Sequence, residues 1–328
     1  MSDKIKKNIS WFFIVSLLIY IVFVIFSDFN LVVKSISSFS IKVFFQVIIV
    51  ILISIFLKFL RWHFYLKEIN ILIPKYDSVM IFLSGLSMSF SPGKLGELLK
   101  SYLLKSKFQF QISITSPVII AERIIEFTSL IIISIFGAIA YNLKFQYLIF
   151  PFLLLILIFF LFRNNRFINL LFTILGKFKF FRQNLEKLTN IRETTFNLFT
   201  WEIFLKMLFI SSFAWLFECY SYYLIVQFFV PEVGFIWISV IYLISIIIGS
   251  VSMTPGGIGT TEGALTYFLY QQNISENIAV TSALLIRVST LWFTIIVGFL
   301  ALMFYKKNNT TKIQLENFEN NKEFSTND

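Results

Sequence analysis

The stretch Ser87-Met-Ser-Phe-Ser-Pro-Gly-Lys-Leu-Gly96 returns almost in register as Ser250-Val-Ser-Met-Thr-Pro-Gly-Gly-Ile-Gly259. Each copy ends an apolar run, and Pro-Gly both removes a backbone donor and lets the chain turn. Irregular backbone at membrane depth is tolerated only where protein buries it or where it lines a watery cavity. Two such breaks in corresponding halves of a chain are typical of a transporter's binding site. The residues that make the two breaks are Pro92, Gly93, Gly96, Pro255, Gly256, Gly257 and Gly259.

The composition indicates a membrane protein. Of 328 residues, 57% are hydrophobic and 14% are charged, and the mean hydropathy is +0.81. A soluble domain carries roughly a quarter charged residues. We therefore expect an all-α polytopic membrane protein. The net charge of +10 calls for no nucleic-acid partner, because the basic residues follow the membrane topology described below.

Apolar runs of bilayer-spanning length, roughly 17–25 residues, predict about six full transmembrane helices. Two further apolar runs, at about 78–91 and 235–253, lead into the breaks and are followed by the helical stretches Lys94–Lys105 and Thr261–Tyr270. We interpret each of these pairs as a re-entrant hairpin. The six expected spans lie at about 11–27, 41–60, 115–141, 147–162, 207–229 and 278–304.

The distribution of Lys and Arg sets the expected orientation. If both termini are cytoplasmic, most of the 28 basic residues fall on the cytoplasmic side. Three spans then separate the two hairpins, so the hairpins enter from opposite sides and the repeat is inverted. The expected organisation is a cytoplasmic N-terminus (1–10), a membrane domain (11–305) and a disordered cytoplasmic tail (306–328). Within the membrane domain, the repeat halves lie at about 41–141 and 207–304, and a basic cytoplasmic segment (163–200) joins them.

Each hairpin is followed by a span that carries an arginine at a similar depth, Arg123 in the first half and Arg287 in the second. Charge inside the membrane is costly and usually faces a cavity. One interpretation is that both arginines bind an anionic head group, for which the planar guanidinium is suited. The alternative is that they form ion pairs with glutamates and hold the two halves together.

Several glutamates accompany these arginines. Glu97 and Glu262 each follow a break, where a carboxylate either stabilises the first turn of a helix or serves as a coupling site or a counter-charge to a cationic head group. Glu122 and Glu126 are one turn apart and share a helix face, whereas Glu218 stands in its span without an evident partner. The residues expected to bind substrate are Arg123, Arg287, Glu122, Glu126, Glu97, Glu262 and Lys94.

The sequence contains no known catalytic or metal-binding motif. With Cys219 as its one cysteine, the chain cannot form an internal disulfide or a metal site built from several thiolates, and its one histidine, His63, is a poor candidate for a metal ligand. We therefore predict no cofactor and no metal, and we favour a protein that is not an enzyme.

Three motifs resemble a known family: Ser91-Pro-Gly-Lys-Leu-Gly-Glu-Leu-Leu-Lys-Ser-Tyr-Leu-Leu104, Ala121-Glu-Arg-Ile-Ile-Glu126 and Thr254-Pro-Gly-Gly-Ile-Gly-Thr-Thr-Glu-Gly-Ala-Leu265. They are similar to the lysylphosphatidylglycerol synthase membrane-domain, or flippase-like, family, which includes the membrane half of the multiple peptide resistance factor. The chain lacks the soluble synthase domain of the full-length enzymes, so we do not expect it to synthesise a lysyl lipid.

The resemblance implies an inner (plasma) membrane protein that translocates a lipid between leaflets. Its expected lipid partner is a phospholipid or a polyprenyl-phosphate-linked glycan. The expected protein partner is a second copy of the chain, in a homo-oligomer, or a separate soluble transferase. The alternatives are a membrane-embedded lipid-linked sugar transferase and an accessory subunit of a lipid-modifying enzyme.

Overall fold

The computed structural model describes residues 29–141 and 185–305, together with single positions at 153, 157 and 174. Within these ranges every regular element is helical, which confirms the all-α polytopic membrane class. The predicted spans at 11–27 and 147–162 lie outside the described residues, as do most of the basic segment and the tail 306–328.

Long apolar helices form the frame of the molecule. Three described helices have the length and hydropathy to cross a membrane: α3 (Ile41–Glu68), α11 (Trp201–Phe229) and a final helix, Glu276–Tyr305, whose first part is α14 (Glu276–Arg287). A fourth long helix, α6 (Ile112–Ala140), is 29 residues long, as is α11. At 1.5 Å per residue, 28 residues extend about 42 Å, more than the roughly 30 Å of a hydrocarbon core.

Helix α3 extends past the span predicted at 41–60 and runs on to Glu68, so Arg61 stands within the helix as Lys58 does. Carboxylates on neighbouring helices compensate the two charges, Glu218 for Lys58 and Glu126 for Arg61.

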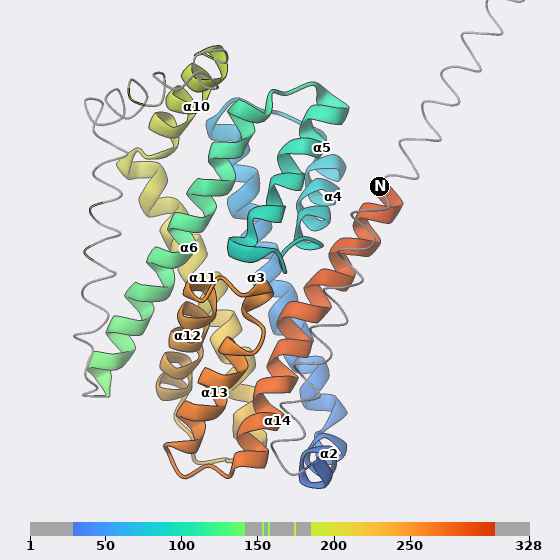
Figure 1. Ribbon diagram of the computed structural model, residues 1–328, viewed down its shortest axis with the longest axis vertical. Helices are drawn as coiled ribbons and strands as arrows, with labels where there is room; N and C mark the ends of the chain where they lie inside the picture. Colours follow the sequence, from blue (N-terminus) through green and yellow to red (C-terminus); the bar gives the residue numbers. More distant parts are fainter. Residues whose placement is uncertain (1–28, 142–152, 154–156, 158–173, 175–184, 306–328) are drawn as a thin grey trace, which may run out of the picture.

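Two broken hairpins enter the bundle from opposite ends (Figure 1). Their turns meet in the middle, where the two short 3₁₀ segments contact each other. This is the inverted arrangement that the sequence predicted. The first hairpin consists of α4 (Lys75–Leu86), η1 (Pro92–Leu98) and α5 (Leu99–Phe108), and the second of α12 (Phe235–Val251), η2 (Pro255–Gly257) and α13 (Thr260–Tyr270).

The two turns have the same backbone conformation and touch reciprocally. Gly93 has φ 59° and ψ 15°, and Gly256 has φ 63° and ψ 10°, a left-handed region that favours glycine. A Cβ on Gly93 would lie 3.7 Å from Sδ of Met253, and a Cβ on Gly256 would lie 3.6 Å from Cα of Phe90. Phe90 and Met253 occupy the same position of the repeated motif. Such reciprocal contacts are those of a local pseudo-two-fold axis between the breaks.

The repeat also includes a short helix at the start of each half, which the sequence analysis did not anticipate. Helix α2 (Phe29–Ser38) precedes α3, and α10 (Leu185–Leu198) precedes α11. Helix α2 packs against α14 of the second series, and α10 packs against α6 of the first. Figure 1 places these two short helices at opposite ends of the bundle. Each series therefore consists of a short helix, a long helix, a broken hairpin and another long helix.

Helices α3 and α11 pack side by side and bring much of the apolar core together. Cys219 is a free cysteine buried on α11. His63 stacks on Phe59 with ring centroids 5.9 Å apart, and its Nδ1 lies 3.4 Å from the Ser78 hydroxyl. Neither residue belongs to a group of potential metal ligands among the described residues.

Candidate functional site: a charged cavity between the two hairpin breaks

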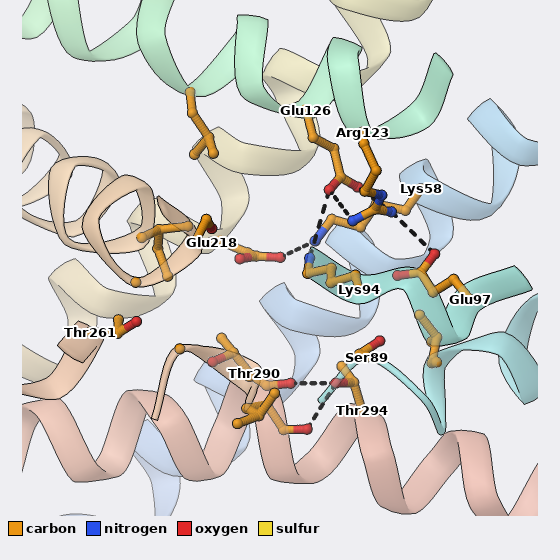
Figure 2. Close-up of a pocket in the computed structure, with 18 of the residues that line it drawn as sticks. Lys58, Ser89, Lys94, Glu97, Arg123, Glu126, Glu218, Thr261, Thr290 and Thr294 are labelled. Atoms are coloured by element: carbon orange, nitrogen blue, oxygen red, sulfur yellow. Dashed lines mark hydrogen bonds and ion pairs between the residues drawn. The ribbon is translucent and has the colours of Figure 1, made fainter. Parts of the chain in front are cut away.

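A cavity of about 160 Å³ lies between the two breaks. One side is lined by charged residues of the first series, and Figure 2 shows Lys58, Arg123 and Glu126 grouped there. Ser89, Thr290 and Thr294 lie on the opposite side (Figure 2). The hydroxyl-bearing residues that line the cavity are Ser89, Ser91, Ser250, Thr254, Thr261, Thr290 and Thr294.

Arg61 of α3 is one of the charged residues that line the cavity. Its Nη2 donates to Glu126 at 2.6 Å and lies 3.5 Å from Glu122, and its Nη1 donates to the Ser211 hydroxyl at 3.0 Å. The two glutamates therefore share one face of α6, as their spacing of four predicted. A fully buried guanidinium is tolerated here because carboxylates and a hydroxyl replace its water.

Lys100 of α5 is a second buried cation, with 1% of its side chain exposed. Its Nζ donates to Glu122 at 2.6 Å and lies 3.1 Å from Glu97. The ammonium also stands over the ring of Trp62, 4.6 Å from the centroid, where the ring face attracts a cation. Lys100 thus fastens the return arm of the first hairpin to α6 and α3.

Arg123 faces the cavity and is held by two carboxylates. Nη1 donates to Glu126 at 2.6 Å, and Nη2 donates to Glu97 at 3.1 Å. The ion-pair interpretation of Arg123 is therefore the one that the geometry realises. Glu97 does not cap a helix: it lies in the 3₁₀ turn and directs its carboxylate to Lys100 and Arg123.

Lys94 stands at the turn itself, with 37% of its side chain exposed, and its Nζ is 3.6 Å from Glu126. Its φ of 55° lies in the left-handed region. We expected a helix to start at this residue. Instead α5 starts at Leu99, because the left-handed pair Gly93 and Lys94 interrupts the helix.

Glu218, which lacked an evident partner in the sequence, is surrounded by donors. It pairs with Lys58 of α3 and accepts hydrogen bonds from the Ser54 hydroxyl at 3.2 Å and the Tyr242 hydroxyl at 3.1 Å. The Lys58 ammonium lies over the Trp215 ring, 4.7 Å from the centroid. This pair joins α3 to α11.

In the second half, Arg287 donates through Nε to Glu262 at 2.7 Å and through Nη2 to the carbonyl oxygen of Gly256. The other carboxylate oxygen of Glu262 accepts the Gly259 N–H at 2.7 Å. The predicted N-terminal capping role is therefore present for Glu262. Arg287 satisfies a carbonyl that the break would otherwise leave without a helical partner.

Hydroxyl groups satisfy much of the remaining broken backbone. Ser91 accepts the Gly96 N–H at 2.6 Å and donates to the Met88 carbonyl at 2.8 Å. Ser252 donates to the Gly249 carbonyl at 2.7 Å in the second hairpin. Each Pro-Gly break is thus supported by a serine that bonds to nearby main-chain atoms.

All seven expected binding residues lie at the two breaks or on the helices beside them. Three basic residues that line this site or pair with its glutamates were not among those expected: Lys58, Arg61 and Lys100. Lys58 and Arg61 are three residues apart at the end of an apolar run, so they share a helix face. That spacing was the one available signal for a paired buried role.

The fold and the site together define a polytopic helical membrane protein with a charged cavity between two inverted broken hairpins. The chain belongs to the lysylphosphatidylglycerol synthase transmembrane-region family, whose model matches residues 13–298. This confirms the family that the three motifs indicated.

Curated relatives are archaeal proteins described as UPF0104 membrane proteins. One from Methanocaldococcus jannaschii is 24% identical over 283 residues, which cover 79% of this chain and 83% of the relative. A second from the same organism is 28% identical over 229 residues, covering 66% of this chain and 92% of the relative. A relative from Methanothermobacter thermautotrophicus is 22% identical over 104 residues, 32% of this chain and 31% of its own length.

Proposed function

We propose that this protein translocates a lipid with a phosphate-containing head group, a phospholipid or a polyprenyl-phosphate-linked glycan, between the leaflets of a membrane. The observation that carries the proposal is the meeting of two inverted Pro-Gly breaks at a charged cavity in the middle of the bundle. Inverted repeats with unwound segments at the substrate site are the arrangement through which carriers expose one site to each side in turn. In this mechanism the head group enters the cavity while the lipid tails stay in the bilayer.

The proposed membrane is the inner (plasma) membrane, with both termini cytoplasmic. The basic bias of the predicted loops supports this orientation. A transferase function has less support, because the site carboxylates Glu97, Glu122 and Glu126 are held by cations within the described part of the chain. A general acid or base needs a proton-accepting group that can change its charge.

Reconstitution into vesicles tests the proposal. A phospholipid with a fluorescent acyl chain is placed in both leaflets of the vesicles. Dithionite added outside reduces the label in the outer leaflet, which includes label that the protein has carried outward from the inner leaflet. We expect the wild-type protein to expose the inner-leaflet label, and the double variant Arg123→Ala, Arg287→Ala to lose this activity. Arg192→Ala is the matched control, since Arg192 is exposed on α10 away from the cavity. Normal movement by a folded double variant would contradict translocation through the cavity that Arg123 and Arg287 line.

A further inference from the structure

Glu218 has fewer cationic partners than the three glutamates of the first series that line the same cavity. Lys58 is the one cation that pairs with Glu218 in the described part of the chain. Movement of that single side chain therefore leaves Glu218 without a cation, whereas each of the other glutamates would keep one. Their pairs are Glu97 with Lys100 and Arg123, Glu122 with Arg61 and Lys100, and Glu126 with Arg61, Lys94 and Arg123.

The other partners of Glu218 suit a carboxyl group that gains and loses a proton. The Ser54 hydroxyl donates to one carboxylate oxygen at 3.2 Å, and the Tyr242 hydroxyl donates to the other at 3.1 Å. A hydroxyl group both donates and accepts, so after reorientation it can accept the hydrogen of a protonated carboxyl. The three glutamates of the first series pair with lysines and arginines, which only donate. Glu218 therefore has hydrogen-bond partners for both of its protonation states.

A proton can reach Glu218 through the cavity. Glu218, Lys58 and Tyr242 all line it, and its volume of about 160 Å³ has room for several water molecules. Figure 2 shows the side chains of Glu218 and Lys58 directed toward each other. The side chain of Glu218 is 10% exposed and that of Lys58 is 16% exposed. The pair is therefore buried enough for an unbalanced charge to be unfavourable, and it is open enough for exchange with cavity water.

The pair also lies between the two series of helices. Lys58 and Ser54 belong to α3 of the first series, whereas Glu218 belongs to α11 and Tyr242 to α12 of the second. A proton on Glu218 removes the charge that holds Lys58, so it releases an ion pair that joins the two series. Protonation and the relative movement of the series are thereby linked.

Other charged and titratable groups surround the pair. On α11 itself, Cys219 and Tyr222 are buried close to Glu218 in sequence. The helices packed against α11 are α3, α6, α12 and α14. From these helices and from η1 across the cavity, the lining groups besides Lys58 and Tyr242 are Arg61 of α3, Glu122, Arg123 and Glu126 of α6, Arg287 of α14, and Lys94 and Glu97 of η1.

We propose that Glu218 carries a proton together with the translocated lipid, so that a proton gradient drives translocation. In the empty site Glu218 is charged and pairs with Lys58. When Lys58 turns to the phosphate of a bound lipid, a proton from the solution adds to the Glu218 carboxylate, because a buried carboxylate without a cation is neutralised rather than left charged. Release of the lipid returns Lys58 to Glu218, and the proton leaves to the solution on that side. This coupling rests on the proposed function, since it needs a phosphate that the protein moves.

Transport by the full chain in vesicles tests the coupling. The probe is acyl-labelled phosphatidylglycerol, a lipid of single negative charge, and protein-free vesicles of the same composition are the blank. Valinomycin with equal potassium on both sides holds the membrane potential at zero. With a lumen more acidic than the outside by about one pH unit and one proton carried per lipid, the label should favour the outer leaflet by about tenfold at steady state. Without a pH difference the label should distribute evenly.

Glu218→Gln keeps the size of the side chain and cannot take up a proton, so it should abolish the bias toward the outer leaflet. Glu202→Gln is the matched control, because Glu202 is exposed in the first turn of the same helix. This control should retain the bias. An undiminished bias in Glu218→Gln would overturn the assignment of the proton to Glu218.

Infrared difference spectra decide the case if Glu218→Gln moves no label. Addition of phosphatidylglycerol to the wild-type protein in detergent should replace a carboxylate band with the band of a protonated carboxyl group, and Glu218→Gln should lack this change. Absence of the change in the wild type would overturn the proposal, as would the same change in the variant.

The coupling and the translocation function fail in different ways. If the wild-type protein moves the label and the distribution stays even despite the pH difference, proton coupling is refuted and the translocation function stands. If it moves no label with or without the pH difference, the translocation function is refuted and the coupling falls with it.

Discussion

Replacing Lys100 with methionine tests whether the buried charges hold the first hairpin in place. Methionine keeps the length of the lysine stem and removes its charge. The Glu122 carboxylate then loses its 2.6 Å donor and retains Arg61 at 3.5 Å. The attraction of the ammonium for the Trp62 ring is lost as well.

The expected cost follows from the burial of the pair. Removing one partner of a buried ion pair destabilises a protein by roughly 3–5 kcal/mol, because the other charge is left in a medium that solvates it poorly. The double variant Lys100→Met, Glu122→Gln leaves every remaining charge paired, since Glu97 keeps Arg123 and Arg61 keeps Glu126. We therefore expect the double variant to be more stable than the sum of the single effects predicts, by about 2 kcal/mol.

The assay is the free energy of unfolding in mixed micelles, titrated with a denaturing detergent, for the wild type, both single variants and the double variant. Lys206→Met is the matched control: its ammonium is 3.9 Å from Glu68 and 49% of its side chain is exposed. Such a pair contributes roughly 0–1 kcal/mol. A loss below about 1 kcal/mol for Lys100→Met, or strictly additive effects in the cycle, would refute the argument that this network is buried and coupled.

Three further variants test the second half by the same unfolding measurement. Gly249→Ala should destabilise the protein by about 1–3 kcal/mol, because the added Cβ would collide with the Thr261 hydroxyl. Adding Thr261→Ala to this variant should restore most of the lost stability, and no restoration would contradict the close contact of α12 and α13. Gly256→Ala should lose about 1–2 kcal/mol at its left-handed φ of 63°, and a stability equal to wild type would show that the turn is not left-handed. Arg287→Lys should lower the free energy of unfolding by about 1–3 kcal/mol, because the lysine ammonium cannot donate to both Glu262 and the Gly256 carbonyl as the guanidinium does. A variant as stable as the wild type would refute this double role of Arg287.

The sequence predicted the two hairpins because Pro-Gly and its flanking residues repeat, and repeated chemistry gives repeated backbone geometry. The agreement extends to the dihedral angles of Gly93 and Gly256. The sequence did not predict helix α2, a ten-residue helix outside the expected membrane spans, which packs against α14. Its position depends on a contact between distant parts of the chain, which periodicity within one segment cannot reveal.

The site was predicted in part for a similar reason. Arg123 and Arg287 stand out because they interrupt apolar runs, and both lie beside the cavity. Arg61 and Lys100 were not expected in the site, because basic residues outside the predicted spans are also typical of cytoplasmic flanks. Their burial depends on carboxylates that lie far along the chain, Glu126 for Arg61 and Glu122 for Lys100.

The distribution of ion pairs between the two series of helices bears on how the molecule could move. The pairs of Arg61, Lys100 and Arg123 are made with glutamates of the first series, and Arg287 pairs with Glu262 of the second. Within the described chain, the one buried ion pair between the series is Lys58–Glu218, alongside the exposed pair of Lys206 and Glu68.

Among the described residues each series is therefore nearly complete in its own charges, and the two are joined at the centre by Lys58–Glu218, the hydrogen bond from Arg61 to Ser211, the reciprocal contact of the breaks and the apolar packing of α3 on α11. Apolar surfaces can slide with little loss of free energy compared with the separation of buried charges. Within the described part of the chain, a rotation of one series against the other would disturb the Lys58–Glu218 ion pair and the Arg61–Ser211 hydrogen bond. That pair borders the cavity, so a ligand anion that draws Lys58 away from Glu218 would loosen the joint between the halves at the moment the site is occupied.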